Sequence, residues 1–237
     1  MTIFITGSTG VLGQELIKIF PDSVHPTHSE LDLEDRNHTF KFLETNVPDI
    51  IIHTAALTGI RECEDDKAKA WRTNVSSTEN LIDAIRICNP NAYFVYVSTA
   101  CIFDGHIGMY KEESIPYPEN FYSLTKLIGE SVVRRSGLSN YLIIRTNFVD
   151  KKKWKYPKAF TDRFGTYLFA ENVANAIKEV LTNHLYGVIH IVGEKKISMF
   201  ELAHLTTPDI KPMTMADYSG PRLTIDMSLD TSRWKKY

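Results

Sequence analysis

Short apolar runs recur along the first two thirds of the chain at intervals of about 45 residues. Four of them lie at residues 2–6, 49–56, 93–97 and 141–145, reading TIFIT, DIIIHTAA, YFVYV and YLIIR. Nearly unbroken apolar runs of this length are typical of parallel strands that are covered on both faces. The pattern therefore predicts four buried strands of one sheet.

Apolar residues recur at helical spacing between these runs. Helices are expected directly after the first run, from Asp35 as N-cap to Leu43, over residues 67–88 and over residues 121–135. A short strand is expected around Val24, and a brief strand or turn at residues 31–33. Alternation of strand and helix predicts an α/β fold with a doubly wound parallel sheet and right-handed crossovers.

The pattern changes after Asp150. Residues 151–158 (KKKWKYPK) are basic and irregular, residues 172–181 and 199–205 have helical spacing, and residues 187–192 (GVIHIV) have the pattern of a strand. We expect two parts, a nucleotide-binding domain over residues 1–150 and a small substrate-binding lobe over residues 151–237 that completes the sheet. The lobe is expected over the carboxyl edge of the sheet, where open α/β sheets bind ligands.

Composition excludes several classes of protein. The 237 residues are 43% hydrophobic and 24% charged, with a formal net charge of −2, so the chain matches soluble globular proteins and offers no broad attraction for nucleic acid or membranes. Cys63, Cys88 and Cys101 form no CxxC pair, so we expect reduced thiols and no metal site. With no signal or membrane-spanning segment evident, a cytoplasmic location is expected, and a homodimer is left open.

A glycine-rich turn follows the first predicted strand and opens the first helix. Gly7, Gly10 and Gly13 have GxxGxxG spacing, which lets backbone N–H groups and the helix N-terminus approach a pyrophosphate. The segment expected to bind the cofactor is Gly7, Ser8, Thr9, Gly10, Val11, Leu12 and Gly13. The alternative is a turn needed only for helix packing. The cofactor interpretation makes the fold Rossmann-type.

Tyr122 and Lys126 stand four residues apart in a predicted helix and so share one face. A free phenol has a pKa of about 10, and a nearby ammonium group favours its ionised form, which prepares the phenol for proton transfer. Thr99, at the end of a predicted strand, has a hydroxyl suited to orienting a substrate oxygen, with Ser98 as the neighbouring candidate. The alternatives are a surface Tyr/Lys pair and hydroxyls that only cap a strand.

Several segments together resemble one family. GSTGVLG resembles the cofactor loop of the extended short-chain dehydrogenase/reductases. LDLEDRN, PDIIIHTAALT, AWRTNV, STACIFDG, FYSLTKLIGE and IIRTNFVD resemble successive blocks of the dTDP-4-dehydrorhamnose reductase subgroup. The resemblance covers residues 1 to about 150, and RFGTYLFAENVANAI and SLDTSRW resemble later family segments. It implies an NAD(P)H-dependent reductase of a nucleotide-linked 4-keto-6-deoxy sugar.

The resemblance also implies roles for individual residues. Tyr122 would give its proton to the carbonyl oxygen, Lys126 would hold the nicotinamide ribose, and Thr99 would be the catalytic hydroxyl. The adenine would be bordered by Asp32 and Leu33, the path to the nicotinamide would be lined by Ala55, Ala56 and Thr58, and the sugar would be contacted by Asn147 and Phe148. Residues 25–29 (HPTHS) lack the carboxylate that commonly binds the ribose of NAD, so NADP is preferred over NAD.

Two positions depart from the subgroup. Ala100 and Cys101 stand where these reductases have Asp and Tyr, and the segment also resembles bifunctional epimerase-reductases that use a cysteine here. Cys101 is therefore a candidate acid/base thiol of the substrate site, with Lys153, Lys155 or Lys158 as its partner, or else a small buried residue. A further alternative is a non-catalytic, NADP-binding regulatory subunit, because similar folds serve that role.

Overall fold

A five-stranded parallel sheet forms the centre of the protein. In the computed structural model, which describes residues 1–237, its spatial order is β1-β2-β3-β4-β9. The strands are β1 (Ile3–Thr6), β2 (Ile50–His53), β3 (Tyr93–Thr99), β4 (Tyr141–Thr146) and β9 (Gly187–Ile191). All four neighbouring pairs are parallel. The predicted fold class is confirmed, and the four apolar runs are the four predicted strands.

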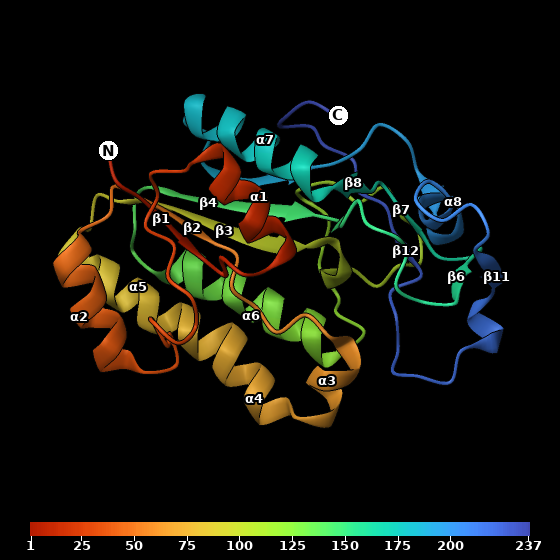
Figure 1. Cartoon of the computed structure of the whole chain (residues 1–237), viewed down its shortest axis with the longest axis horizontal. Coiled ribbons are helices and arrows are strands. Elements are labelled where there is room, and N and C mark those ends of the chain that lie inside the picture. The colour runs from red at the N-terminus through yellow and green to blue at the C-terminus, as the bar shows by residue number, and fades with distance from the viewer.

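Helices cover both faces of the sheet (Figure 1). One face carries α1 (Val11–Ile19) and α7 (Ala170–Thr182), and the other carries α2 (Arg36–Asn46), α5 (Ser77–Cys88) and α6 (Phe121–Arg135). Asp35 caps α2 as expected, since its carboxylate accepts a hydrogen bond from the His38 amide. Each face has its own apolar core, which explains why the strands between the two cores have unbroken apolar sequences.

The helix predicted over residues 67–88 is interrupted. It consists of α4 (Lys67–Trp71), a π-helical turn at Arg72–Ser76, and α5. Asn74 lies within the π turn, where its side chain exchanges hydrogen bonds with the backbone of Leu57 and donates to the Thr125 hydroxyl. Such single π turns commonly occur at functional sites. The helix α3 (Ile60–Asp65), which precedes α4, was not predicted.

The strand expected around Val24 is reduced to one parallel bridge with Phe4. Pro21 and Pro26 flank this position, and a proline cannot donate a backbone hydrogen bond to a neighbouring strand. The prediction of a strand is therefore wrong in extent, although Val24 does extend the sheet beyond β1. Residues 31–33 form a turn and not a strand.

Residues 151–237 contribute to two regions. Helix α7 and strand β9 belong to the central layers, and the remaining elements form a lobe beyond the carboxyl edge of the sheet (Figure 1). The short elements of residues 151–237 are β6 (Lys158–Phe160), β7 (Phe164–Gly165), β8 (Leu168–Phe169), β10 (Ile197–Ser198), α8 (Met199–His204), β11 (Lys211–Met213), a 3₁₀ turn at Met215–Asp217 and β12 (Asp226–Met227), and β5 (Phe148–Val149), which pairs with β8, directly precedes them. The domain boundary at residue 150 stays a prediction. None of the helices has the length and apolar character needed to span a bilayer.

His53, at the end of β2, is completely enclosed. Its Nδ1 lies 2.6 Å from the Thr6 hydroxyl, and its Nε2 lies 3.1 Å from the Thr78 hydroxyl. Because Thr78 donates its proton to the Asn74 carbonyl, it accepts from Nε2–H, and Nδ1 accepts from Thr6. Burial lowers the pKa of His53 to about 3, with a smaller effect from Lys126. The imidazole is therefore neutral, and its two hydrogen bonds join Thr6 of β1 to Thr78 of α5.

The fold should lose stability in acid through His53. Between pH 6.5 and 3 the unfolded chain takes up a proton at this position that the folded protein does not, so the free energy of unfolding falls with pH, by about 2–3 kcal/mol from pH 7 to 4.5. Urea unfolding at both pH values should show a smaller fall for His53→Gln than for the wild type. The exposed His106→Gln is the matched control, and equal falls in all three proteins would contradict the assignment.

Candidate active site

The carboxyl ends of the parallel strands bring the predicted residues to one edge of the sheet. Gly7 follows β1, Ala55 follows β2, Thr99 ends β3 and Asn147 follows β4. The chain continues from β1 to Val24 on one side and to β2 on the other side. The end of β1 is thus the point where the strand order reverses, which is where open α/β sheets bind nucleotides.

The glycine turn is held by close backbone approaches. Gly7 has a φ of +70°, and a Cβ atom there would lie 2.6 Å from the Ala55 nitrogen. A Cβ atom on Gly13 would lie 2.1 Å from the Gly7 carbonyl oxygen, whereas one on Gly10 would lie 3.2 Å from the same oxygen. The turn is thus too tight for side chains at Gly7 and Gly13, and it leads directly into the N-terminus of α1, whose first amides lack helical partners.

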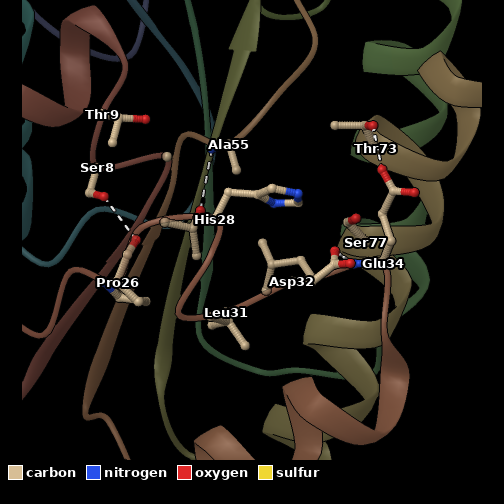
Figure 2. A pocket seen from close by; sticks show the side chains of 13 residues that line it. Ser8, Thr9, Pro26, His28, Leu31, Asp32, Glu34, Ala55, Thr73 and Ser77 are labelled. Carbon is tan, nitrogen blue, oxygen red and sulfur yellow. Dashed lines mark hydrogen bonds between the residues drawn. The ribbon is translucent and has the colours of Figure 1, made fainter.

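An open pocket of about 540 Å³ lies beside this turn (Figure 2). Its lining includes six of the residues predicted to bind the cofactor, namely Gly7, Ser8, Thr9, Asp32, Leu33 and Ala55. The other predicted cofactor residues, Gly10, Val11, Leu12, Gly13, Ala56, Thr58, Tyr122 and Lys126, do not line it. The pocket therefore corresponds to the adenosine end of the predicted dinucleotide site.

Seven lining residues were not predicted: Thr6, Pro26, His28, Leu31, Glu34, Thr73 and Ser77. Figure 2 shows the His28 ring directed into the pocket, and Thr73 and Ser77 facing it from the helical side. Thr73 lies within the π turn at residues 72–76, and Ser77 follows it directly. Periodicity of apolar residues carries no information about polar positions on the other side of a helix, so Thr73 and Ser77 were not identified.

The pocket contains two carboxylates that lie outside residues 25–29, and the preference for NADP over NAD stays a prediction. Asp32 and Glu34 both line the pocket, and they come from the turn that follows residues 25–29. The Glu34 carboxylate accepts hydrogen bonds from the Thr73 hydroxyl at 2.6 Å and from Arg72 Nε at 3.3 Å. No lysine or arginine lines the pocket. The acidic side chains are thus supplied a few residues later than the sequence motif suggests.

Tyr122 and Lys126 lie one turn apart on α6, as predicted. Asn120 caps this helix by accepting a hydrogen bond from the Ser123 amide. Lys126 is only 3% exposed, and Tyr122 packs against the apolar cluster that contains Cys101. The Thr99 hydroxyl accepts a hydrogen bond from the Cys101 amide at 3.2 Å and lies near enough to the Tyr122 phenol to lower its pKa. The structure therefore brings Thr99, Tyr122 and Lys126 together at the end of β3.

The electrostatics of this group differ from the expectation. Burial raises the pKa of Tyr122, and the nearby Thr99 side chain opposes this rise only in part. Lys126 does not contribute to it, because its Nζ lies over the Tyr96 ring, 4.1 Å from the centroid. Burial also lowers the pKa of Lys126 to about 7, against the opposing charge of Glu130. The prediction that Lys126 lowers the pKa of Tyr122 is therefore wrong for this arrangement of the side chains.

Glu130, one turn beyond Lys126, forms a buried ion pair with Arg145 of β4. The Arg145 Nε and Nη2 atoms donate to the two carboxylate oxygens at 2.9 and 2.8 Å, and both side chains are 1% exposed. Ser98, next to Thr99, donates to the same carboxylate at 2.7 Å. The pair therefore fixes α6 against β3 and β4. In the sequence, this ion pair is indicated only by an acidic residue that stands four positions after Lys126 and so lies on the same face of the helix.

Cys101 lies in a short 3₁₀ turn (Ala100–Ile102) and is 7% exposed. Its Sγ lies 3.1 Å from Met227 Sδ, and its charge, when ionised, would act on the Tyr122 phenol. The candidate partners Lys153, Lys155 and Lys158 are exposed, and none forms a hydrogen bond with this thiol. The thiol is thus close to the predicted proton donor, in apolar surroundings.

The two predicted sugar contacts diverge. Asn147 is buried and donates from Nδ2 to the Met227 carbonyl at 2.9 Å, which places it beside the Cys101 cluster. Phe148, in β5, packs against the apolar core formed with α1 and α7. The structure therefore places Asn147, and not Phe148, beside the cluster that contains Cys101.

Comparisons with known proteins agree with this geometry. The family model described as "RmlD substrate binding domain" matches residues 1–221. A solved structure of a hypothetical dTDP-4-dehydrorhamnose reductase from Sulfolobus tokodaii is 31% identical, with a TM-score of 0.86, over 98% of this chain and 93% of that one. The dTDP-4-dehydrorhamnose reductase of Aggregatibacter actinomycetemcomitans is 27% identical over 85% of this chain and 76% of its own length.

A curated relative with a different name covers more of the chain. Methionine adenosyltransferase 2 subunit beta of Bos taurus is 26% identical over 98% of this chain and 80% of its own length. A dTDP-4-dehydrorhamnose reductase of Bacillus anthracis, solved in complex with NADP, is 22% identical with a TM-score of 0.87, over 96% of this chain and 89% of that one, and so supports the fold. These similarities extend over both the nucleotide-binding layers and the lobe.

A methyl group on the glycine turn should distinguish its two tight positions. Gly13→Ala forces a backbone shift, because its Cβ would overlap the Gly7 carbonyl, whereas Gly10→Ala meets a contact that a small movement relieves. Titration of protein fluorescence with NADH and NADPH should show affinity at least about tenfold lower for Gly13→Ala and nearly unchanged for Gly10→Ala. Equal affinities for the two variants would contradict the role of the turn.

Removal of the Glu130 charge should destabilise the protein through Arg145. Glu130→Gln leaves a buried guanidinium unpaired, and we expect a loss of about 3–5 kcal/mol in the free energy of unfolding. The double variant Glu130→Gln/Arg145→Gln should recover more than half of this loss, because no buried charge is left uncompensated. Denaturant unfolding measures both. If the loss in the double variant equalled the sum of the losses in Glu130→Gln and Arg145→Gln, the two side chains would not be coupled.

Proposed function

Because the chain belongs to the RmlD substrate-binding-domain family, of the NAD(P)-dependent oxidoreductases of the short-chain dehydrogenase/reductase type, we propose that it reduces a nucleotide-linked 4-keto-6-deoxy sugar. The observation that carries this proposal is the proximity of Thr99 and Tyr122 at the carboxyl edge of the sheet, with Lys126 one turn further along α6. A hydroxyl, a phenol and an amine in this order support carbonyl reduction by proton transfer.

The residues present fit a nicotinamide dinucleotide. Gly7 and Gly13 form a turn that any Cβ would fill, and such turns accommodate a pyrophosphate against the helix N-terminus. Asp32 and Ala55 border the pocket where the adenosine would lie. When bound, the cofactor supplies the hydride. Both NADPH and NADH are candidates, and the carboxylates of Asp32 and Glu34 favour NADH, since they repel a 2′-phosphate.

Burial gives Tyr122 and Lys126 complementary roles. Because its pKa is raised, the phenol is protonated at neutral pH and holds the proton that the carbonyl oxygen requires. Thr99 would orient that oxygen through its hydroxyl. Lys126, with a pKa of about 7, would hold the ribose, and its charge decreases as the pH rises above 7.

Two alternative functions are each supported by one specific observation. An epimerase-reductase would use Cys101, whose thiol lies beside Tyr122 in the apolar cluster, although the candidate lysines are not bonded to it. A regulatory subunit without catalysis has the support of the similarity to methionine adenosyltransferase 2 subunit beta over 98% of the chain. The intact group of Thr99, Tyr122 and Lys126 favours the reductase.

The decisive assay follows NADPH and NADH absorbance with dTDP- and UDP-4-keto-6-deoxyglucose, with and without a separate 3,5-epimerase. The proposal predicts turnover that depends on added epimerase. It predicts a rate lower by about 10²–10⁴-fold for Tyr122→Phe and an unchanged rate for the exposed Tyr117→Phe. Turnover without epimerase that is lost in Cys101→Ala would favour the bifunctional enzyme. Cofactor binding without turnover of any sugar would favour the regulatory subunit.

A further inference from the structure

Arg163, directly before β7, is a buried arginine with few partners. It is 7% exposed, and its Nε donates to the Thr224 carbonyl at 2.9 Å. Its other two nitrogens face sulfur, with Nη2 3.2 Å from Met227 Sδ and Nη1 3.9 Å from Met199 Sδ. A thioether is a weak acceptor, so most of the donor capacity of this guanidinium is unused within the chain.

The charge of Arg163 is also uncompensated. No carboxylate lies within ion-pair distance of it, whereas Arg145, which is also buried, binds both oxygens of Glu130. Asp226, next to Met227, is engaged by Lys196 and by Ser228. A buried charge without a partner costs free energy. The fold itself does not explain why a guanidinium is kept among methionines.

Tyr167, which follows β7 in the chain, provides a further hydrogen-bond donor without a partner. Its hydroxyl is buried and has no hydrogen-bond partner in the protein. Burial raises the pKa of this phenol, and the positive charge of Arg163 opposes the rise, so the group stays protonated at neutral pH and the two side chains are neighbours. The tyrosine ring packs against Gly165, where a Cβ atom would lie 2.6 Å from Cζ of the ring, which holds the hydroxyl in place.

Both groups adjoin the proposed proton donor. Met227 Sδ lies against Arg163 and also 3.1 Å from Cys101 Sγ. Tyr122 and Tyr167 pack against the same apolar cluster, which contains Cys101 and Met227. The unused donors of Arg163 and Tyr167 therefore lie across this cluster from the phenol of Tyr122, on the side of the lobe.

We propose that Arg163 and Tyr167 form an anion-binding subsite for the substrate, which holds a negatively charged oxygen group while the carbonyl lies at Tyr122. The group is either the diphosphate of a nucleotide sugar or a carboxylate on the sugar ring, and both present the oxygen acceptors that a guanidinium binds bidentately. Met199 and Met227 give way on binding, because unbranched methionine side chains repack readily. The subsite rests on the proposed function for its role, but its anion binding is independent of turnover.

Stability measurements on the free protein test the uncompensated charge. Arg163→Met places a third thioether beside Met199 and Met227. We expect this variant to have a higher melting temperature than the wild type, because it removes a buried charge that has no partner and that the protein keeps for binding at a cost in stability. The matched control Arg145→Met should melt at a lower temperature, because it strands the Glu130 carboxylate. A lower melting temperature for Arg163→Met would show that the guanidinium is structural and would overturn the proposal.

Anion binding is measured by thermal shift with inorganic pyrophosphate and with D-glucuronate, which represent the two sources. At ten times the dissociation constant, the effective anion should raise the melting temperature of the wild type by about 3–5 °C. The shift should be absent in Arg163→Met and reduced in Tyr167→Phe. A shift with pyrophosphate only indicates the diphosphate, and one with glucuronate only indicates a ring carboxylate. Equal shifts in wild type and Arg163→Met, or none in either, would overturn the proposal.

These outcomes are separable from those of the reductase assay. Anion-dependent shifts that require Arg163, together with no turnover of any sugar, would refute the proposed function and leave the subsite standing. Turnover together with anion shifts that do not depend on Arg163 would refute the subsite alone.

Discussion

The arrangement of the candidate catalytic edge depends on the buried ion pair between Glu130 and Arg145. The pair connects three elements near the carboxyl edge of the sheet. Glu130 lies on α6, one turn after Lys126, and its carboxylate accepts hydrogen bonds from Ser98 of β3 and from Arg145 of β4. The carboxylate gives the helix directional contacts with both β3 and β4. A charge pair of this kind adds little net stability, but its geometry is specific, and geometry is what a three-residue catalytic group requires.

Burial acts in opposite directions on the two ionisable groups of α6. It raises the pKa of the Tyr122 phenol and lowers the pKa of the Lys126 ammonium, because desolvation disfavours whichever form is charged. The same apolar surroundings therefore keep a proton on the oxygen and weaken its retention on the nitrogen. This state suits a protein that has to deliver a proton to a carbonyl oxygen, and it arises without direct contact between the two side chains.

The sequence predicts the layers well because each strand is buried on both faces and so has an unbroken apolar run. It also predicts that Gly7, Ala55 and Thr99 share an edge, since the carboxyl ends of parallel strands must meet there. It does not predict Thr73, Ser77 or the partner of Glu130, because these depend on which helix faces which strand across about 15 to 70 residues of chain. The electrostatic prediction for Tyr122 was wrong because spacing gives proximity along a helix and not the direction in which the Lys126 side chain extends.

The π turn at Arg72–Ser76 limits which deletions this segment of the chain can tolerate. A π turn contains one residue more than an α-helical turn, and here that extra residue rotates Asn74 toward the backbone of Leu57 and toward Thr125 on α6. Deletion of one residue from this segment would give a regular helix with equally good backbone hydrogen bonds, yet it would turn the amide away from both partners. The irregular turn is thus retained for the reach of one side chain, and homologous chains that keep an asparagine here should also keep the odd residue beside it.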